Sequence, residues 1–371
     1  MSTKLNESKR LMSLDVLRGL VLFMLVFFQP VLWSLGQVVD KPWMDAVLYH
    51  FDHETWQGFR VWDMVMPLFM FMAGASIPFS MEKYRTDKKK AYSRIVRRVL
   101  LLWILGMVVQ GNLLGLDPKY FRYFSNTLQA IAAGYLISSL LYLNLKPKWQ
   151  IVSVLVLLLL YWAPTTFLGD FTPEGNLPMR IDKLILGRHM DGVSYDAAGQ
   201  WHYADWYTYT WIFSSLTFAV TVMLGTLAGQ IIKNGIDKKK NASRLILCGV
   251  SLVVIALVWS LQMPIIKRIW TCSMALYAGG FSFILLGLFH YFVDYKGWTS
   301  GVSWLRIYGM NSITAYMLGE AVNFRSVVNS VSYGLEQYMG DWYNVWLTFG
   351  NYAIVFLILL VLYKNKVFIK I

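Results

Sequence analysis

The chain has 371 residues, of which 57% are hydrophobic, 16% aromatic and only 15% charged, and its mean hydropathy is +0.47. Soluble domains carry roughly 25% charged residues, so the composition excludes an ordinary soluble protein and predicts an integral membrane protein. The formal net charge of +13 does not indicate nucleic-acid binding, because the basic residues lie between apolar segments, as the positive-inside rule expects. Cys248 and Cys272 show neither a disulfide framework nor a metal-ligand spacing.

Ten apolar segments follow one another, each about long enough to cross a membrane as a helix. The first is about a full span and follows a polar stretch, so we interpret it as a membrane helix and not as a cleavable signal peptide. We expect an all-α, polytopic membrane protein with a single domain over residues 1–371. The predicted spans are 14–36, 61–80, 95–112, 124–143, 149–167, 209–232, 245–261, 269–292, 304–321 and 345–363.

The basic residues predict the orientation of these helices. If the helices alternate in direction, most basic residues fall on one side, which places both termini in the cytoplasm. The loops of about 37–60 and 168–208 then lie on the outer side. The basic residues that carry this assignment are Lys83, Arg85, Lys88, Lys89, Lys90, Arg94, Arg97, Arg98, Lys146, Lys148, Lys233, Lys238, Lys239, Lys240, Arg244, Lys364, Lys366 and Lys370.

The longer outer loop is rich in aromatic and polar side chains. Aromatic faces suit sugar rings, but an aromatic belt at the membrane interface explains the same composition equally well. The loop therefore leaves both a glycan contact and a membrane-interface role open. The residues concerned are Tyr195, Trp201, His202, Tyr203, Trp206 and Tyr207.

The segment from His53 to Asp63 leads into the second predicted span and contains the strongest candidates for catalytic residues. Ionisable groups at a membrane edge are costly and often functional. Histidine has the intrinsic pKa of a general base near neutrality, and Glu54 or Asp63 is available to orient it. The alternative is an ordinary interfacial histidine. His50 shares a helical face with His53 if the loop is helical, but no third ligand has convincing spacing, so we predict no metal site.

Further polar side chains gather in the outer half of the predicted spans. At a helical rise of about 1.5 Å per residue, Gln29 and Gln129 fall in this outer half and Asn311 near the middle of the membrane. This pattern suits an embedded site that opens outward. The alternative for Gln129 and Asn311 is that their amides only join helices by hydrogen bonds.

Two other patterns have structural explanations. Arg18 and Asp15 are spaced to pair on one helix face, with anion binding by Arg18 as the equal alternative. Gly225 and Gly229 are four residues apart within a small-residue stretch, which predicts a face for close helix packing and no chemistry.

Several stretches, in order along most of the chain, resemble the heparan-α-glucosaminide N-acetyltransferase family of transmembrane acyltransferases. Before this resemblance is considered, position and composition leave a membrane enzyme and a transporter open. The matching stretches are SLDVLRG at 13–19, HETWQG at 53–58, DMVMPLF at 63–69, GASI at 74–77, LQ at 128–129, ID at 181–182, Lys267 with WT at 270–271, and GMNSI at 309–313.

The resemblance implies transfer of an acetyl group from cytosolic acetyl-CoA to an amino sugar on the far side of the membrane. His53 matches the family's essential histidine. Gln29 stands where the family has an asparagine, and Ala130 where an arginine commonly follows the glutamine of the fourth helix. The family's acidic-proline-glycine stretch is also replaced at 207–211. These departures leave the acceptor open.

We therefore predict an acetyl-CoA-dependent N- or O-acetyltransferase for an amino sugar or glycan acceptor at the outer, periplasmic side of a bacterial inner membrane. The rival function is secondary transport of a sugar or other small polar solute. The sequence leaves open whether the protein is a homodimer. It also leaves open whether the acetyl group passes directly to the acceptor or through an acetyl-histidine intermediate. The predicted site residues are His53, Asp63 and Gln29 for catalysis, Gln129, Asn311, Trp56 and Glu54 for the substrate, and Arg18, Arg97 and Arg98 for the CoA phosphates.

Overall fold

The structure is a computed structural model, and it describes residues 11–84, 86–204 and 207–369. Arg85, Trp206 and Lys370, which entered the sequence interpretation, lie outside the described residues. By its internal contacts the chain divides into two compact units. We call them the first unit (Met1–Asp52, Ile236–Ile246 and Leu285–Lys370) and the second unit (His53–Gly235 and Leu247–Ile284). The expected single domain over 1–371 stays a prediction.

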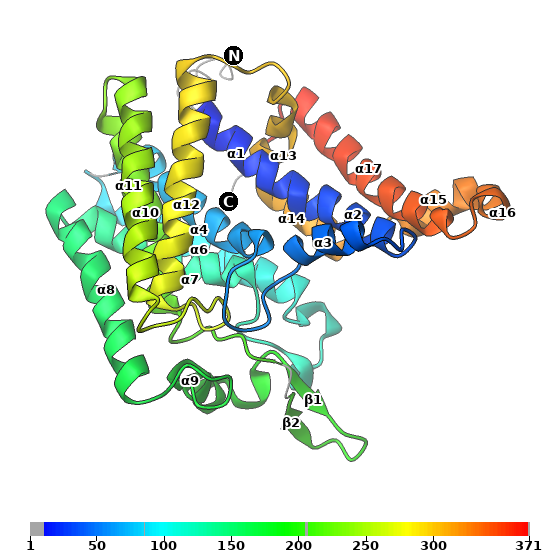
Figure 1. Ribbon diagram of the computed structural model, residues 1–371, viewed down its shortest axis with the longest axis horizontal. Helices are drawn as coiled ribbons and strands as arrows, with labels where there is room; N and C mark the ends of the chain where they lie inside the picture. Colours follow the sequence, from blue (N-terminus) through cyan, green and yellow to red (C-terminus); the bar gives the residue numbers. More distant parts are fainter. Residues whose placement is uncertain (1–10, 85, 205–206, 370–371) are drawn as a thin grey trace. The chain divides into compact units, whose positions relative to one another are not determined.

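The first unit joins the N-terminal membrane helix to the C-terminal helices, drawn in blue and in orange to red (Figure 1). Its longest helix, α17, packs against α2, α13, α14 and α15, and α1 packs against α13. The elements are α1 (Met12–Phe23), η2 (Met24–Phe28), α2 (Gln29–Gly36), α3 (Pro42–His50), η8 (His290–Tyr295), η9 (Ser303–Leu305), α13 (Arg306–Met310), α14 (Ser312–Ala321), α15 (Arg325–Ser332), η10 (Tyr333–Leu335), α16 (Glu336–Met339) and α17 (Trp342–Lys364).

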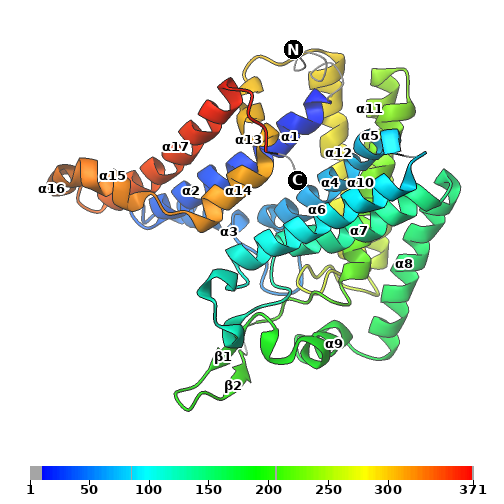
Figure 2. The ribbon, with the colours of Figure 1, turned by 180° about the vertical axis from the view of Figure 1, so that it is seen from behind.

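The second unit is built around α4 and α10, with α7 packed against both (Figure 2). α6 packs on α7, and α8 packs on α10. α11 (Lys238–Trp259) and α12 (Cys272–Phe289) contribute residues to both units. The other elements are η3 (Val61–Met64), α4 (Val65–Ala75), α5 (Ile77–Met81), η4 (Glu82–Tyr84), α6 (Lys88–Val109), η5 (Leu113–Gly115), η6 (Pro118–Tyr120), α7 (Thr127–Asn144), α8 (Pro147–Phe167), α9 (Leu177–Leu186), η7 (Gly187–His189) and α10 (Ser215–Asn234).

Seven helices of the described chain are long and apolar enough to cross a membrane. They correspond to seven of the ten predicted spans and are Met12–Gly36, Val61–Tyr84, Pro147–Phe167, Ser215–Asn234, Lys238–Trp259, Cys272–Tyr295 and Trp342–Lys364. The segments predicted at 95–112 and 124–143 form α6 and α7, and the segment at 304–321 forms two shorter helices. The chain is therefore a mostly helical integral membrane protein, while ten spans and cytoplasmic termini stay predictions.

A small β-hairpin interrupts the expected all-α fold. β1 (Val193–Tyr195) pairs antiparallel with β2 (Trp201–Tyr203), so that Val193 faces Tyr203. Gly199 lies in the turn with φ of +77°, a conformation that favours glycine. The hairpin belongs to the aromatic loop that was predicted on the outer side, and its three-residue strands are too short to stand out in the sequence.

The predicted glycine face does pack closely, as expected. A Cβ added to Gly225 would lie 1.9 Å from the backbone oxygen of Phe71, and one added to Gly229 would lie 2.3 Å from that of Ala75. On the other helix, a Cβ on Gly74 would lie 1.9 Å from the backbone oxygen of Val222. Glycines on both helices, which have no side chain, therefore let the α4 and α10 backbones come into contact. This contact fixes α4, whose N-terminal end carries the candidate site.

Candidate active site

Asp63 organises the segment that enters α4. It lies in the 3₁₀ turn Val61–Met64, and its side chain is fully buried. Its Oδ2 atom accepts hydrogen bonds from the backbone N–H of Arg60 at 2.9 Å and of Glu54 at 3.2 Å. These two bonds fold residues 54–63 back on themselves. The second carboxylate oxygen, Oδ1, remains for side-chain partners.

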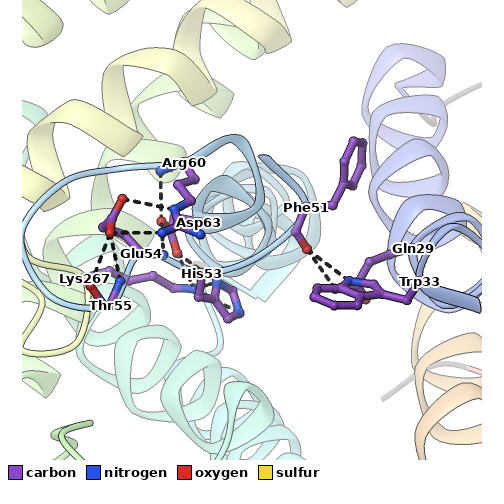
Figure 3. Close-up of polar contacts among 9 residues, drawn as sticks. All are labelled: Gln29, Trp33, Phe51, His53, Glu54, Thr55, Arg60, Asp63 and Lys267. Atoms are coloured by element: carbon purple, nitrogen blue, oxygen red, sulfur yellow. Dashed lines mark hydrogen bonds and ion pairs between the residues drawn. The ribbon is translucent and has the colours of Figure 1, made fainter. Parts of the chain in front are cut away.

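His53 is the first of those partners. Its Nδ1 atom lies 2.8 Å from Asp63 Oδ1, and 38% of its side-chain surface is exposed (Figure 3). An ionised carboxylate can only accept hydrogen bonds, so this contact assigns the ring hydrogen to Nδ1. The lone pair then lies on Nε2. A buried carboxylate behind a half-exposed imidazole is an arrangement that suits a general base or a nucleophile.

Lys267 is the second partner, and it comes from a distant part of the sequence. Its ammonium nitrogen lies 3.2 Å from Asp63 Oδ1 and 2.9 Å from His53 Nδ1, with His53 Nε2 at 3.5 Å (Figure 3). Only 7% of its side chain is exposed. Burial lowers the pKa of Lys267 to about 8, against the opposing effect of the Asp63 carboxylate, which raises it.

The connection that carries Lys267 is held in place by hydrogen bonds. The N–H of Gly58 donates to the Ile265 carbonyl at 2.9 Å, and Gly58 has φ of +129°, a conformation that favours glycine. Thr271 accepts a bond from the Ile266 N–H and donates to the Pro264 carbonyl at 2.8 Å. The His53 segment and the Lys267 connection are thus joined directly by backbone.

Trp270, three residues after Lys267, adopts a left-handed backbone conformation with φ of +50°. This conformation costs a non-glycine residue about 1–3 kcal/mol and is often found at functional sites. The indole of Trp270 is buried and donates to Thr221 Oγ1 at 3.1 Å. Ser214 further fixes the turn by donating to the Ile269 carbonyl at 3.1 Å.

Glu54, the other carboxylate considered for orienting His53, forms hydrogen bonds with Arg60 instead. Its oxygens accept hydrogen bonds from Arg60 Nε at 3.0 Å and Arg60 Nη2 at 3.2 Å. The Arg60 bond lowers the pKa of Glu54. Trp56 donates its indole N–H to the Phe171 carbonyl at 2.8 Å, which joins this segment to the loop over 168–208. Asp63 is therefore the carboxylate that contacts His53.

Gln29 and Asn311 lie in the first unit, whereas His53 lies in the second. Gln29 follows the π-helical turn η2, and its Nε2 donates to the Phe51 carbonyl at 3.1 Å (Figure 3). Asn311 separates α13 from α14; its Nδ2 donates to the Val367 carbonyl at 3.1 Å, and its Oδ1 accepts from the Ile369 N–H at 3.0 Å. Their catalytic and substrate roles stay predictions.

Gln129 is fully buried near the start of α7. Its Oε1 accepts from the Ser125 N–H, and its Nε2 donates to the Tyr123 carbonyl, both at 2.8 Å. Asn126 caps the same helix by accepting from the Leu128 N–H at 2.9 Å. These contacts organise the start of α7 and do not join two helices, which was the structural alternative expected from the sequence. A substrate contact by Gln129 stays a prediction.

The three cations predicted for the CoA phosphates lie in different units. Arg18 of the first unit is 3.5 Å from Asp15 Oδ1, so the predicted pairing forms. Arg97 and Arg98 lie on α6 of the second unit, where Arg97 is exposed and Arg98 lies over the Tyr135 ring at 4.3 Å. Their role in CoA binding stays a prediction. Within the described ranges, no cluster of three His, Cys, Asp or Glu side chains could hold a metal ion.

The partnership of Lys267 with His53 and Asp63 was missed by sequence reasoning, which noted Lys267 only as part of a family match. A signal was present, because Lys267 and Arg268 are the charged residues of the connection 260–271 between two membrane helices. Such a cation is expected to pair with a carboxylate. Nothing local indicates that the partner lies 204 residues away.

These features define an integral membrane protein in which a histidine, a buried carboxylate and a buried lysine meet at a helix end. The family model described as "Heparan-alpha-glucosaminide N-acetyltransferase, catalytic" matches residues 10–176, a range that contains His53 and Asp63. The resemblance expected from the motifs is thus confirmed.

Two curated relatives extend this similarity over most of the chain. The chain is 26% identical over 367 residues to heparan-alpha-glucosaminide N-acetyltransferase of Mus musculus, covering 85% of this chain and 54% of the relative. It is 25% identical over 363 residues to the Homo sapiens protein of the same name, covering 83% and 52%. The chain therefore spans about half the length of the curated relatives it matches.

Proposed function

We propose that this protein is a transmembrane acyltransferase that moves an acetyl group from acetyl-CoA to an amino sugar or glycan acceptor. The observation that carries the proposal is the His53 imidazole, which is partly exposed and backed at 2.8 Å by the buried Asp63 carboxylate. The names of the two relatives support acetyl transfer to a glucosaminide. The acceptor of this chain and the choice between N- and O-acetylation belong to the proposal.

In direct transfer, the acceptor amine or hydroxyl attacks the thioester carbonyl carbon of acetyl-CoA. The proton of the acceptor passes to the lone pair of His53 Nε2. Asp63 stabilises the imidazolium that forms, as a carboxylate partner does in other histidine bases. The carbon–sulfur bond then breaks, and the departing CoA thiolate takes up the proton. The imidazole returns to its starting state.

In two-step transfer, His53 Nε2 itself attacks the thioester and carries the acetyl group as an acyl-imidazole. The carbon–sulfur bond breaks, and CoA leaves as the thiolate before the acceptor binds. The acceptor then attacks the acetyl carbon, the bond from that carbon to Nε2 breaks, and the acceptor proton passes to solvent. The two routes differ in a measurable way, because only the second releases about one equivalent of CoA per protein in a rapid burst without an acceptor. In both, the oxyanion requires hydrogen-bond donors. Gln29, Gln129 and Asn311 are our candidate donors, since each amide NH₂ has a second hydrogen besides the one described above.

We place the acceptor on the outer side and acetyl-CoA on the cytoplasmic side of a bacterial inner membrane. The distribution of basic residues supports this orientation. The aromatic hairpin supports a glycan acceptor, because Trp201 is 41% exposed and its ring centroid lies 5.2 Å from that of Tyr203. Such exposed aromatic faces suit sugar rings. Whether the protein is a homodimer is left open.

Secondary transport of a sugar is kept as the second candidate because two predicted membrane helices are broken. The first contains the π-helical turn η2 before Gln29, and the segment predicted at 304–321 is interrupted at Asn311. Discontinuous helices form substrate sites in many transporters. The clustered His53 and Asp63 favour the enzyme, since transport alone does not require an activated imidazole.

The test is CoA release by the purified full chain in nanodiscs, with acetyl-CoA and a panel of amino sugars and neutral sugars. We expect acceptor-dependent release by the wild type and a fall of at least about 100-fold in His53→Ala. His50→Ala, which changes an exposed histidine three residues earlier, is the control and keeps the wild-type rate.

Two results would contradict the proposal. Equal rates in His53→Ala and His50→Ala would reject His53 as the catalytic residue. No release with any acceptor, together with sugar uptake into proteoliposomes, would identify a transporter.

A further inference from the structure

Asp63 and Lys267 compete for one position on His53. Asp63 Oδ1 lies 2.8 Å and Lys267 Nζ 2.9 Å from His53 Nδ1. An ionised carboxylate only accepts hydrogen bonds, and an ammonium only donates them. His53 Nδ1 therefore either carries a hydrogen for Asp63 or offers a lone pair to Lys267. It cannot do both at once.

The surroundings of Asp63 decide between the two states. Its Oδ2 accepts two backbone N–H groups, which favours the ionised carboxylate. Oδ1 can accept from the ring and from the ammonium together, since Lys267 Nζ lies 3.2 Å from it. With the hydrogen on Nε2 instead, the Nδ1 lone pair would face a carboxylate oxygen at 2.8 Å, which is repulsive. The hydrogen therefore belongs on Nδ1.

The Lys267 ammonium also affects whether His53 takes a second proton. A positive imidazolium would lie 2.9 Å from the ammonium nitrogen, and like charges at this range disfavour each other. Asp63 has the opposite effect and favours the imidazolium. Because Lys267 is almost fully buried, water and salt screen its charge much less than that of a surface lysine.

We propose that Lys267 is a positioning residue that keeps the His53 imidazole neutral, while Asp63 holds the ring hydrogen on Nδ1 and so leaves the lone pair on Nε2. The catalytic meaning of this inference rests on the proposed function, in which His53 must be unprotonated when it receives the acceptor proton or attacks the thioester. Lys267 itself acts through His53 and Asp63.

Glu54, Arg60 and Arg268, which are other charged residues of these segments, have partners of their own. Glu54 and Arg60, on the same segment as His53, pair with each other at 3.0 Å. Arg268 follows Lys267, and its positive charge lowers the pKa of Lys267. Two groups of opposite charge, Asp63 of η3 and Lys267 of the connection before α12, lie 2.8 Å and 2.9 Å from His53 Nδ1.

The simpler alternative is that Lys267 only neutralises Asp63 and so stabilises the fold. A loss of stability in a Lys267 variant would fit either explanation. The protonation of His53 separates them, because only the proposed role requires Lys267 to oppose the charging of the imidazole.

Diethyl pyrocarbonate reads out this protonation directly, because it modifies unprotonated imidazole and needs neither acetyl-CoA nor an acceptor. The full chain in nanodiscs is treated from about pH 5 to about pH 9, and the peptide that contains His53 is quantified by mass spectrometry. The variants are Lys267→Met, which keeps the length and removes the charge, and Lys267→Arg, which keeps the charge.

We expect the midpoint of His53 modification to rise by about 1–3 pH units in Lys267→Met, the range for a charge within 4–6 Å. In Lys267→Arg the midpoint stays within about half a unit of wild type, because the cation remains. A Lys267→Met midpoint at or below that of the wild type overturns the inference.

A second comparison covers the case in which Lys267→Met fails to fold because Asp63 is left buried without its cation. Asp63→Asn is then compared with Asp63→Asn combined with Lys267→Met. The midpoint is again higher without the lysine if the inference holds, and equal or lower if it is wrong.

The experiment also separates this inference from the proposed function. A raised midpoint in a chain that transfers no acetyl group supports the role of Lys267 and rejects the enzyme. Acetyl transfer with an unshifted midpoint supports the enzyme and rejects the role of Lys267.

Discussion

Asp63 is the residue through which the candidate site is assembled, since it bonds the backbone of its own segment and the side chains of His53 and Lys267. We predict that Asp63→Asn lowers kcat for acetyl transfer by about 100- to 10,000-fold. The amide lacks the charge that stabilises the imidazolium, and its NH₂ group can donate to Nδ1 and favour the wrong tautomer. Steady-state kinetics would measure the loss.

Asp45→Asn is the matched control for Asp63→Asn, because Asp45 is an exposed aspartate on α3. It should retain the wild-type kcat. An Asp63→Asn protein with the same kcat as Asp45→Asn would show that the carboxylate is structural only.

The sequence singles out His53 and Asp63 as candidates because they lie just before and at the start of a membrane helix, where ionisable groups are costly. It could not separate Glu54 from Asp63 as the partner of His53, since both are close in the chain. The choice depends on Arg60, whose guanidinium engages Glu54 in a fork. Lys267 could not be assigned, because its contact with Asp63 depends on the path of the chain across several helices.

At the scale of elements, the α4–α10 contact provides the firmest prediction. A methyl group on Gly225 would lie 1.9 Å from the Phe71 carbonyl oxygen, and a backbone atom within a helix cannot move aside as a flexible side chain does. Gly225→Ala should therefore destabilise the protein by about 1–3 kcal/mol, the usual cost of overpacking. Thermal unfolding in detergent would measure this loss.

Gly334→Ala serves as the control for Gly225→Ala, because an added Cβ there meets nothing within 4 Å. Its melting temperature should equal that of the wild type. If Gly225→Ala has the same melting temperature as Gly334→Ala, α4 and α10 do not pack as closely as the structure shows.

Apolar length predicted where helices form, but it could not predict where they break. The sequence predicts 304–321 as one span, yet Asn311 divides it into α13 and α14. The cause is distant, since the Asn311 amide bonds the backbone of Val367 and Ile369 near the C-terminus. The π-helical turn before Gln29 has a local cause, because Pro30 lacks the N–H that would bond Val26 in a regular helix.

At the scale of the whole molecule, the division into two compact units was not predicted. The first unit combines the N-terminal segment with Ile236–Ile246 and Leu285–Lys370, which are separated by most of the second unit in the sequence. Hydropathy and loop charges assign each helix a length and a direction but no neighbour. Membrane class and helical content could therefore be read from composition, whereas the pairing of helices could not.

The orientation in the membrane yields the last prediction. Residues 198 and 89 belong to the second unit, both are exposed, and the charge distribution assigns them to opposite sides. In a background with Cys248 and Cys272 changed to alanine, a membrane-impermeant maleimide should label Ala198→Cys in intact cells. Lys89→Cys should react only after lysis, because residue 89 lies in the basic cluster expected in the cytoplasm.

Labelling of Lys89→Cys but not Ala198→Cys in intact cells would invert the orientation. The aromatic hairpin would then face the cytoplasm, where acetyl-CoA is made. A glycan acceptor held at that hairpin would lie on the same side as acetyl-CoA, and the reaction would not require transfer of the acetyl group across the membrane. Under the proposed function, labelling limited to Ala198→Cys would support an acceptor on the outer side and acetyl-CoA on the cytoplasmic side.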